Sequence, residues 1–240
     1  MATLEQINQV VEQESKFVEG VLAEMGQVVV GQRAILERLL IGVLTGGHIL
    51  IEGVPGLAKT LIINTLGKVL NLGFSRIQFT PDLLPADLIG TMVYYQQEQA
   101  FKPKLGPIFS NLVLADEINR APAKVQSALL EAMAEKQVTI GEQTYKMDDP
   151  FLVFATQNPV DQEGTYQLPE AQMDRFLMKL IIGYPSKEDE KIILERMTGA
   201  EMPTAKSVME GTDIARIRKI ISEIYVDEKV KMYVLDLIHA

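Results

Sequence analysis

Cysteine is absent from the 240 residues of this chain. Its absence excludes disulfide bonds, thiolate metal sites and cysteine nucleophiles, and it suits a reducing compartment. Long apolar runs are missing too, since no segment approaches the roughly 18 residues that a membrane span needs. The N-terminus, MATLEQINQVVEQES, lacks the basic and apolar regions of a secretory signal. We therefore expect a cytoplasmic protein without a membrane span.

Basic residues are fewer than acidic residues in this sequence. The sequence has 23 Lys and Arg against 32 Asp and Glu, a net charge of -9, and no run rich in Lys or Arg. A general nucleic-acid binder needs the opposite balance because it must neutralise phosphates, so no nucleic-acid partner is expected. Apolar residues at 47% and charged residues at 23% are typical of a globular protein. A chain of this length can bury a full core, as one large domain or as a core with a small appendage.

Short apolar runs alternate with segments of helical periodicity along the chain. The expected strands are residues 49–51, 76–79, 112–115, 151–156 and 177–182, and the expected helices are residues 4–25, 34–44, 59–70, 124–135, 169–176, 186–197, 213–224 and 227–238. This alternation predicts an α/β fold in which a five-stranded parallel sheet lies between helices. We expect the core to span residues 1–183, with two β-hairpins at 91–103 and 137–147. Residues 184–240 are predicted to form a small, all-helical domain.

The segment after the first expected strand has the pattern of a phosphate-binding loop. An apolar run enters a Gly/Pro-rich turn, and Lys59 and Thr60 then open a helix. Backbone N–H groups and the helix N-terminus would bind phosphate oxygens, Lys59 would add a point charge, and the Thr60 hydroxyl would ligate Mg²⁺. Ala58 stands where the usual pattern has Gly, which costs about 1 kcal/mol or more if its φ must be positive. The alternative interpretation is an ordinary Gly/Pro turn of an α/β protein.

Polar residues follow two other expected strands. Asp116 and Glu117 come directly after residues 112–115, and ligands bind at the carboxyl ends of strands in open α/β sheets. Asp116 would hold the Mg²⁺ shell and Glu117 would polarise the attacking water, although solvated acids also end many strands. Asn158 follows residues 151–156, where its amide could bind a γ-phosphate or the water. By itself, an Asn-Pro pair is typical of a turn.

Four longer segments carry a family resemblance. They are GVPGLAKT at residues 53–60, QFTPDLLPADLIGT at 78–91, the run from 106 to 135 that contains LVLADEINR, and FATQNPVDQEGTYQLPEAQMDRF at 154–176. Over residues 28–200 the chain resembles the AAA+ ATPases, a branch of the P-loop nucleotidases, and more narrowly the MoxR-type group. An alanine before the loop lysine is usual in that group.

The resemblance implies ATP and Mg²⁺ as cofactors, a homo-oligomeric, hexameric ring, and catalysis at the boundaries between subunits. Lys59 and Thr60 fall on the phosphate-binding pair, and Asp116 and Thr60 on the metal-associated residues. Glu117 falls on the catalytic base, Asn158 on the first sensor, and Arg175 on an arginine finger that enters the neighbouring subunit. Without the resemblance, Arg175 would be interpreted as a surface ion-pair partner of Asp174 or Glu170. The expected nucleotide-binding residues are Val30, Gly31, Gly53, Val54, Pro55, Gly56, Leu57, Ala58, Lys59, Thr60 and Leu61.

The expected function is that of a chaperone-like ATPase that remodels or matures a client protein or complex. The resemblance suggests a von Willebrand factor A domain protein as a partner, and the two hairpins as the moving elements. The family's second sensor arginine, in a small-residue/Pro/Arg motif, is not found before Ala240, so the helical lid is expected to be incomplete. One alternative is a nucleotide-gated interaction module with little turnover. Another is a DNA-associated motor, which the acidic balance disfavours.

Overall fold

The computed structural model describes residues 4–159, 166–199 and 203–239. The strands are β1 (Ile49–Glu52), β2 (Phe74–Gln78), β3 (Gly90–Tyr95), β4 (Ala100–Leu105), β5 (Leu112–Asp116), β6 (Gln137–Ile140), β7 (Gln143–Lys146), β8 (Leu152–Gln157) and β9 (Met178–Ile181). The helices are α1 (Leu4–Glu14), α2 (Lys16–Val28), α3 (Arg33–Thr45), α4 (Lys59–Val69), α5 (Pro85–Ile89), the 3₁₀ helix η1 (Ile118–Arg120), α6 (Ala123–Glu135), α7 (Glu170–Met173), α8 (Lys187–Met197), α9 (Gly211–Ser222) and α10 (Glu228–Ile238).

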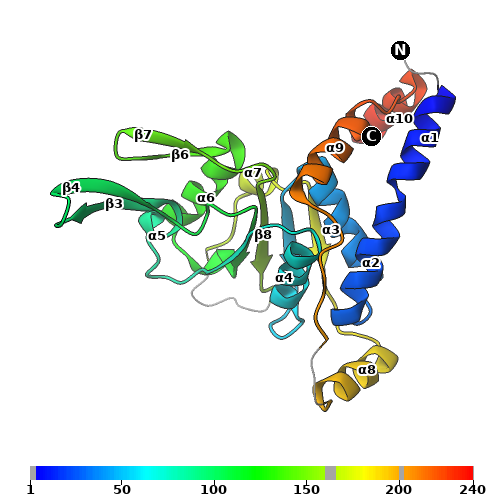
Figure 1. Cartoon of the computed structure of the whole chain (residues 1–240), viewed down its shortest axis with the longest axis horizontal. Helices are drawn as coiled ribbons and strands as arrows, with labels where there is room; N and C mark the ends of the chain where they lie inside the picture. Colours follow the sequence, from blue (N-terminus) through cyan, green and yellow to red (C-terminus); the bar gives the residue numbers. More distant parts are fainter. Residues whose placement is uncertain (1–3, 160–165, 200–202, 240) are drawn as a thin grey trace.

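Five strands form one parallel sheet in the order β2-β5-β8-β1-β9, which confirms the predicted architecture (Figure 1). The interior strand β5 is buried along its whole length because helices cover both faces of the sheet. Its side chains alternate between the faces. Leu112 and Leu114 belong to the apolar cluster on one side, and Val113 and Ala115 to the cluster on the other.

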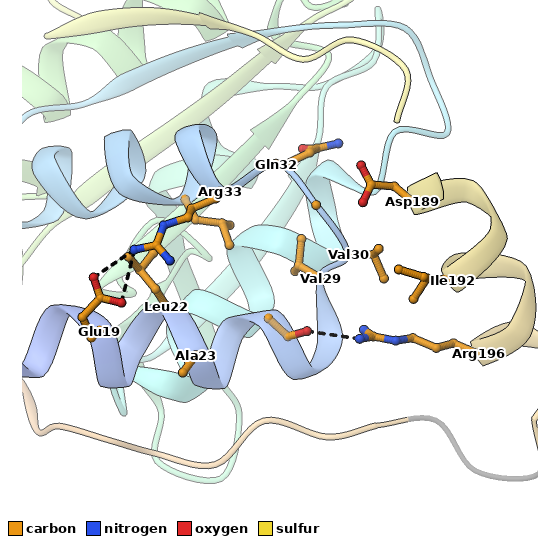
Figure 2. Close-up of a pocket in the computed structure, with 13 residues that line it drawn as sticks. Glu19, Leu22, Ala23, Val29, Val30, Gln32, Arg33, Asp189, Ile192 and Arg196 are labelled. Carbon is orange, nitrogen blue, oxygen red and sulfur yellow. Dashed lines mark hydrogen bonds and ion pairs between the residues drawn. The ribbon is translucent and has the colours of Figure 1, made fainter. Parts of the chain in front are cut away.

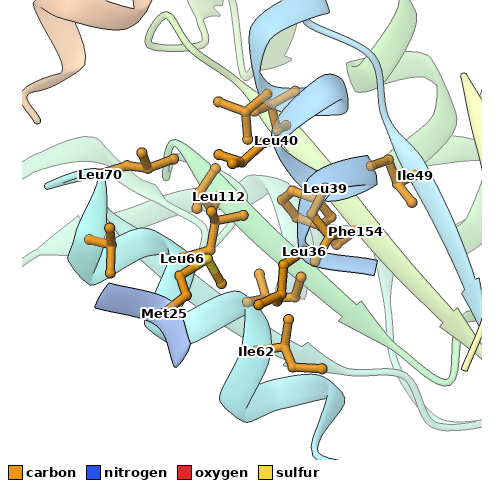
Figure 3. Packing of buried hydrophobic residues seen from close by; sticks show 14 of the residues in the cluster. Met25, Leu36, Leu39, Leu40, Ile49, Ile62, Leu66, Leu70, Leu112 and Phe154 are labelled. Atoms are coloured by element: carbon orange, nitrogen blue, oxygen red, sulfur yellow. The ribbon is translucent and has the colours of Figure 1, made fainter. Parts of the chain in front are cut away.

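The larger apolar cluster lies between the sheet and helices α2, α3, α4 and α9. Figure 3 shows Leu39 of α3, Leu66 of α4 and Phe154 of β8 packed together, all fully buried. The second cluster packs α6 against the opposite face through residues such as Leu129 and Met133. Close packing on both faces fixes the strands, and hence the polar residues at their carboxyl ends.

The N-terminal helical region differs from the prediction of one helix over residues 4–25. It is divided at Ser15 into α1 and α2, and α2 continues to Val28. The Ser15 hydroxyl donates to the carbonyl of Glu12 at 3.1 Å. Such local hydroxyl-to-carbonyl bonds compete with the helical ladder, which accounts for the break. The predicted helix over residues 169–176 is also shorter, since α7 ends at Met173.

Both predicted hairpins are present, and they extend from the same side of the core (Figure 1). Strands β3 and β4 form one hairpin, with the rings of Tyr94 and Phe101 5.1 Å apart. Strands β6 and β7 form the other, which turns at Gly141 with φ of +64°. A Cβ built at Gly141 would lie 3.1 Å from the Met92 side chain, so the two hairpins touch at this turn.

The segment after β9 is helical, as predicted, but its helices lie apart (Figure 1). Helix α8 lies beside the C-terminal end of α2. Helix α9 packs on α3, buries Ile214 and Ile217, and binds the Val43 carbonyl through Arg218 at 3.0 and 2.6 Å. A distinct domain over residues 184–240 stays a prediction.

Among the described residues, no helix combines the length and apolar character of a membrane span.

Candidate nucleotide and metal site

The predicted phosphate loop joins β1 to α4 and forms one wall of a cavity of 490 Å³. Loop residues 55–61 line it together with Asp116, Glu117 and Asn158. Gly53 and Val54, which begin the loop, are not part of this lining. The structure therefore brings together residues from the ends of three parallel strands, β1, β5 and β8. Two further polar residues, Arg76 and Gln78 of β2, complete the lining.

The loop places Ala58 in the left-handed region, with φ of +55°. The sequence alone left this angle open, and its positive value means that the alanine is strained by about 1 kcal/mol relative to glycine. Gly56, at φ of +86°, also adopts a conformation that favours glycine. Gly53 is required for a different reason, because a Cβ there would lie 2.8 Å from the carbonyl oxygen of Ile182.

Lys59 is the first residue of α4 and is half-buried. Its ammonium group donates to the carbonyl of Gly53 and, at 3.1 Å, to that of Val54. Burial lowers the pKa of Lys59, whereas the negative charges of Asp116 and Glu117 act to raise it. The ammonium group is thus held by the loop's own backbone, within a cavity that also contains both acids.

Asp116 is buried and its two carboxylate oxygens have different partners. The Thr156 hydroxyl donates to Oδ1 at 2.6 Å, and Arg76 donates to Oδ2 through Nη2 at 2.6 Å and Nε at 3.0 Å. Thr156 also accepts the backbone N–H of Glu117 at 2.8 Å. One hydroxyl at the end of β8 therefore positions both acids at the end of β5.

Glu117 has φ of +58°, so the predicted base sits at a left-handed turn between β5 and η1. Its Oε2 accepts from Nε2 of Gln78 at 2.8 Å and lies 3.2 Å from Nε of Arg120. Its side chain is 21% exposed, which leaves the carboxylate open to the cavity. Strain of this kind is concentrated at functional sites.

The residues present fit Mg²⁺. Among the described residues, no group of three or more His, Cys, Asp or Glu is placed to hold a metal ion. Mg²⁺ is usually bound through only one or two carboxylates together with substrate phosphates and water. Asp116 and the Thr60 hydroxyl border the same cavity and supply hard oxygen ligands.

A second cavity, of 360 Å³, adjoins the phosphate loop and is lined mainly by apolar side chains. It is bordered by residues 28–30, by Gly56, Leu57, Ala58 and Leu61, and by Ile193, Arg196 and Met197 of α8. Val30, one of the expected nucleotide-binding residues, therefore borders an apolar cavity next to the predicted phosphate loop, on the side where a nucleotide base would lie. An apolar cavity with few polar groups is typical of such sites.

Gly31 faces a neighbouring cavity between α2, α3 and α8 (Figure 2). Its φ is +65°, and a Cβ would lie 2.6 Å from Oδ2 of Asp189 on α8. Arg196 binds the last carbonyls of α2, those of Gln27 at 2.8 Å and Gly26 at 3.3 Å. Gly31 thus allows α8 to approach this segment rather than lining the apolar cavity itself.

Arg175 lies away from its own phosphate cavity. The side chain donates through Nη1 to the carbonyl of Leu130 on α6 at 2.5 Å. It borders a separate cavity of 290 Å³ with Glu131 and Gln172, and the residue is exposed. This position leaves Arg175 accessible to another molecule.

Three residues of the site escaped the sequence reasoning: Arg76, Gln78 and Thr156. Gln78 pairs with Asp116 in the β2–β5 register, and Thr156 pairs with Ile51 in the β8–β1 register. Gln78 and Thr156 lie near the carboxyl ends of their strands, whereas Arg76, the first residue of the expected strand 76–79, gave no such signal. Residues 160–165 of the segment that carries Asn158 lie outside the described part of the chain.

Comparison with known proteins agrees with this geometry. A sequence profile of the ATPase family associated with various cellular activities (AAA) matches residues 48–178. Chaperone MoxR1 of Mycobacterium tuberculosis is 51% identical over 223 residues, covering 93% of this chain and 59% of that protein. Protein MoxR of Paracoccus denitrificans is 33% identical over 179 residues, covering 72% of this chain and 52% of that protein.

A crystal structure of a candidate ATPase from Cytophaga hutchinsonii superposes with a TM-score of 0.88 at 54% identity, covering 97% of this chain and 72% of that one. The chain spans 59% and 52% of the length of the two curated relatives named above. Both relatives carry the MoxR name, and the matched profile includes the phosphate loop and both acids. The chain belongs to the AAA+ family of ATPases, in its MoxR-type branch.

Proposed function

We propose that the protein binds ATP with Mg²⁺ and hydrolyses it at the interfaces of a ring, and that hydrolysis remodels or matures a client protein. The observation that supports this most strongly is the convergence of Lys59, Thr60, Asp116, Glu117 and Asn158 on one cavity. These groups come from three strands and supply a cation, two oxygen ligands, a base and a neutral amide. The chaperone name of the Mycobacterium relative supports the client role.

Each group has a distinct task in this proposal. The loop N–H groups and the α4 N-terminus bind the phosphate oxygens, and Lys59 turns from the loop carbonyls toward the terminal phosphates. Thr60 and Asp116 hold the metal, which offsets charge on the transferred phosphoryl group when bound. Glu117 accepts a hydrogen bond from the attacking water, and Asn158 orients the water or the γ-phosphate.

Arg175 supplies a guanidinium to the neighbouring subunit in this proposal. Its exposure, and its location outside its own phosphate cavity, support a role in trans. An arginine added at the transition state accelerates phosphoryl transfer and couples hydrolysis to assembly.

The decisive experiment is Glu117→Gln, which removes the base and keeps the side-chain shape. The variant is expected to bind ATP with the affinity of the parent and to release phosphate at less than about one hundredth of its rate. Glu142→Gln is the matched control, since Glu142 is exposed at the turn of the β6–β7 hairpin. Hydrolysis by Glu117→Gln at the parent rate would show that the base is assigned wrongly.

A nucleotide-gated interaction module is the second candidate. It is favoured by the contacts of the Glu117 carboxylate, which is engaged by Gln78 and Arg120 in this structure. A protein of this kind would assemble in response to ATP and release no phosphate. Sedimentation and phosphate release, measured on the same samples, separate the two functions.

A further inference from the structure

Arg76 is a cation built into the metal side of the nucleotide cavity. Its guanidinium binds Oδ2 of Asp116 through two nitrogens, at 2.6 and 3.0 Å. The other carboxylate oxygen is already occupied by the Thr156 hydroxyl at 2.6 Å. The carboxylate that is proposed to hold Mg²⁺ is thus neutralised by a side chain of the same chain.

The two partners of this ion pair differ in their exposure to solvent, which affects how a metal would compete with Arg76. The side chain of Asp116 is only 11% exposed, so water screens its charge weakly, whereas that of Arg76 is 47% exposed. On the proposed assignment, Mg²⁺ or a water bound to it would approach the Asp116 carboxylate, whose Oδ2 is held by Arg76. Two cations at one carboxylate oxygen repel each other, and Mg²⁺ binds oxygen ligands at about 2.1 Å, closer than the guanidinium does.

We infer that Arg76 is a resident counter-ion of Asp116 that Mg²⁺ must displace, and that Arg76 thereby sets how strongly nucleotide binding depends on the metal. The inference rests on the proposed nucleotide function. Without metal, the guanidinium offsets Asp116 and so permits an anionic nucleotide to bind beside it. With metal, the same guanidinium is a competitor. Removing it therefore has opposite effects on the two binding reactions.

A purely structural role makes a different prediction. Arg76 lies on β2, the strand at the edge of the sheet, and its Nη2 also donates to Oε1 of Gln78 at 2.6 Å. If these contacts served only to hold the strand, their loss would weaken nucleotide binding with and without metal alike. The sign of the two changes distinguishes the roles.

The test is a titration of a fluorescent, non-hydrolysable ATP analogue, first in EDTA and then at increasing Mg²⁺. Arg76→Met keeps the aliphatic stem and removes the charge. It is expected to weaken binding of the analogue in EDTA at least about fivefold. The Mg²⁺ concentration that gives half of the metal-dependent increase in binding should fall by a similar factor. Arg76→Lys keeps the charge without the paired donors, so it should retain metal-free affinity while its Mg²⁺ midpoint still falls.

Arg216→Met is the control, since Arg216 pairs with Asp213 at 3.4 Å outside the nucleotide cavity. Its metal-free affinity for the analogue and its Mg²⁺ midpoint should both equal those of the parent. Circular dichroism verifies folding, and Arg76→Lys alone decides the question if Arg76→Met does not fold. An unchanged Mg²⁺ midpoint, or changes of the same sign with and without metal, overturns the role of Arg76. If the parent binds no analogue at saturating Mg²⁺, the proposed function fails and this inference falls with it.

Discussion

His48 gives this protein a stability that should depend on pH in a specific window. The residue precedes β1 and is buried, with 7% of its surface exposed. Its Nδ1 accepts the backbone N–H of Val153 at 2.9 Å, and its Nε2 lies 3.3 Å from the carbonyl oxygen of Met133. Only the neutral ring with its proton on Nε2 satisfies both partners, since an N–H can only donate and a carbonyl can only accept. Protonation of Nδ1 would break the bond to β8.

Burial lowers the pKa of His48 to about 4 from the ordinary value of 6.5; the Met133 carbonyl opposes this effect and the Lys136 charge adds to it. The unfolded chain therefore binds a proton near pH 6.5, whereas the folded chain resists until about pH 4. Between these values the unfolded state holds more protons, so the free energy of unfolding falls as the pH falls. The full loss is about 3 kcal/mol, of which about 2 kcal/mol is expected by pH 5.

The measurement is urea unfolding of the parent and of His48→Asn at pH 7 and pH 5. Asparagine cannot titrate and keeps an oxygen near the position of Nδ1, so carboxylates contribute equally to both proteins and cancel in the difference. The parent should lose about 2 kcal/mol more than the variant between the two pH values. His239→Asn, a change of the exposed histidine near the chain end, should retain the parent's pH dependence. Equal losses in the parent and in His48→Asn would refute a neutral, buried His48.

Further predictions concern the loops and the subunit boundary. Ala58→Gly relieves a positive φ, so chemical unfolding should show a gain of about 1 kcal/mol, and a loss would contradict the strain. Gly31→Ala should lose more than about 1 kcal/mol, whereas Gly26→Ala, in a helix with nothing within 4 Å of the new Cβ, should be neutral or stabilising. Equal effects at the two glycines would argue against the close approach of α8. Lys59→Ala and Arg175→Ala should each abolish phosphate release, and mixed subunits should recover part of it. An assembled mixture without any recovery would rule out a site shared between subunits.

Much of the fold could be predicted because its signals are local. Most core strands are short apolar runs, although β2 reads FSRIQ, and the phosphate loop is a contiguous pattern that ends in Lys59 and Thr60. The pair Asp116 and Glu117 also follows its strand directly. These elements needed only the rule that parallel strands share one carboxyl edge. The break at Ser15 could not be predicted because the apolar residues keep their helical spacing across it. The break depends on one hydrogen bond, from the Ser15 hydroxyl to the Glu12 carbonyl.

The rest of the site depends on strand order, which local patterns do not contain. Arg76 and Thr156 meet Asp116 because β2 and β8 flank β5, although both residues lie 40 positions away in the sequence. Their types carry no signal alone, since an arginine or a threonine in a strand is usually a surface or packing residue. The conformation of Ala58 was equally inaccessible, because φ is fixed by how β1 and α4 are held in the folded core.

The Thr156 hydroxyl has a single proton, and that proton is committed to Asp116 while the oxygen receives the N–H of Glu117. The two acids are consequently tied to one atom at the tip of the adjacent strand. Any sliding between β5 and β8 would displace Asp116 and Glu117, the proposed metal ligand and the proposed base, together. Heat or denaturant that separates β5 from β8 should therefore abolish metal binding and hydrolysis in a single step, not one after the other.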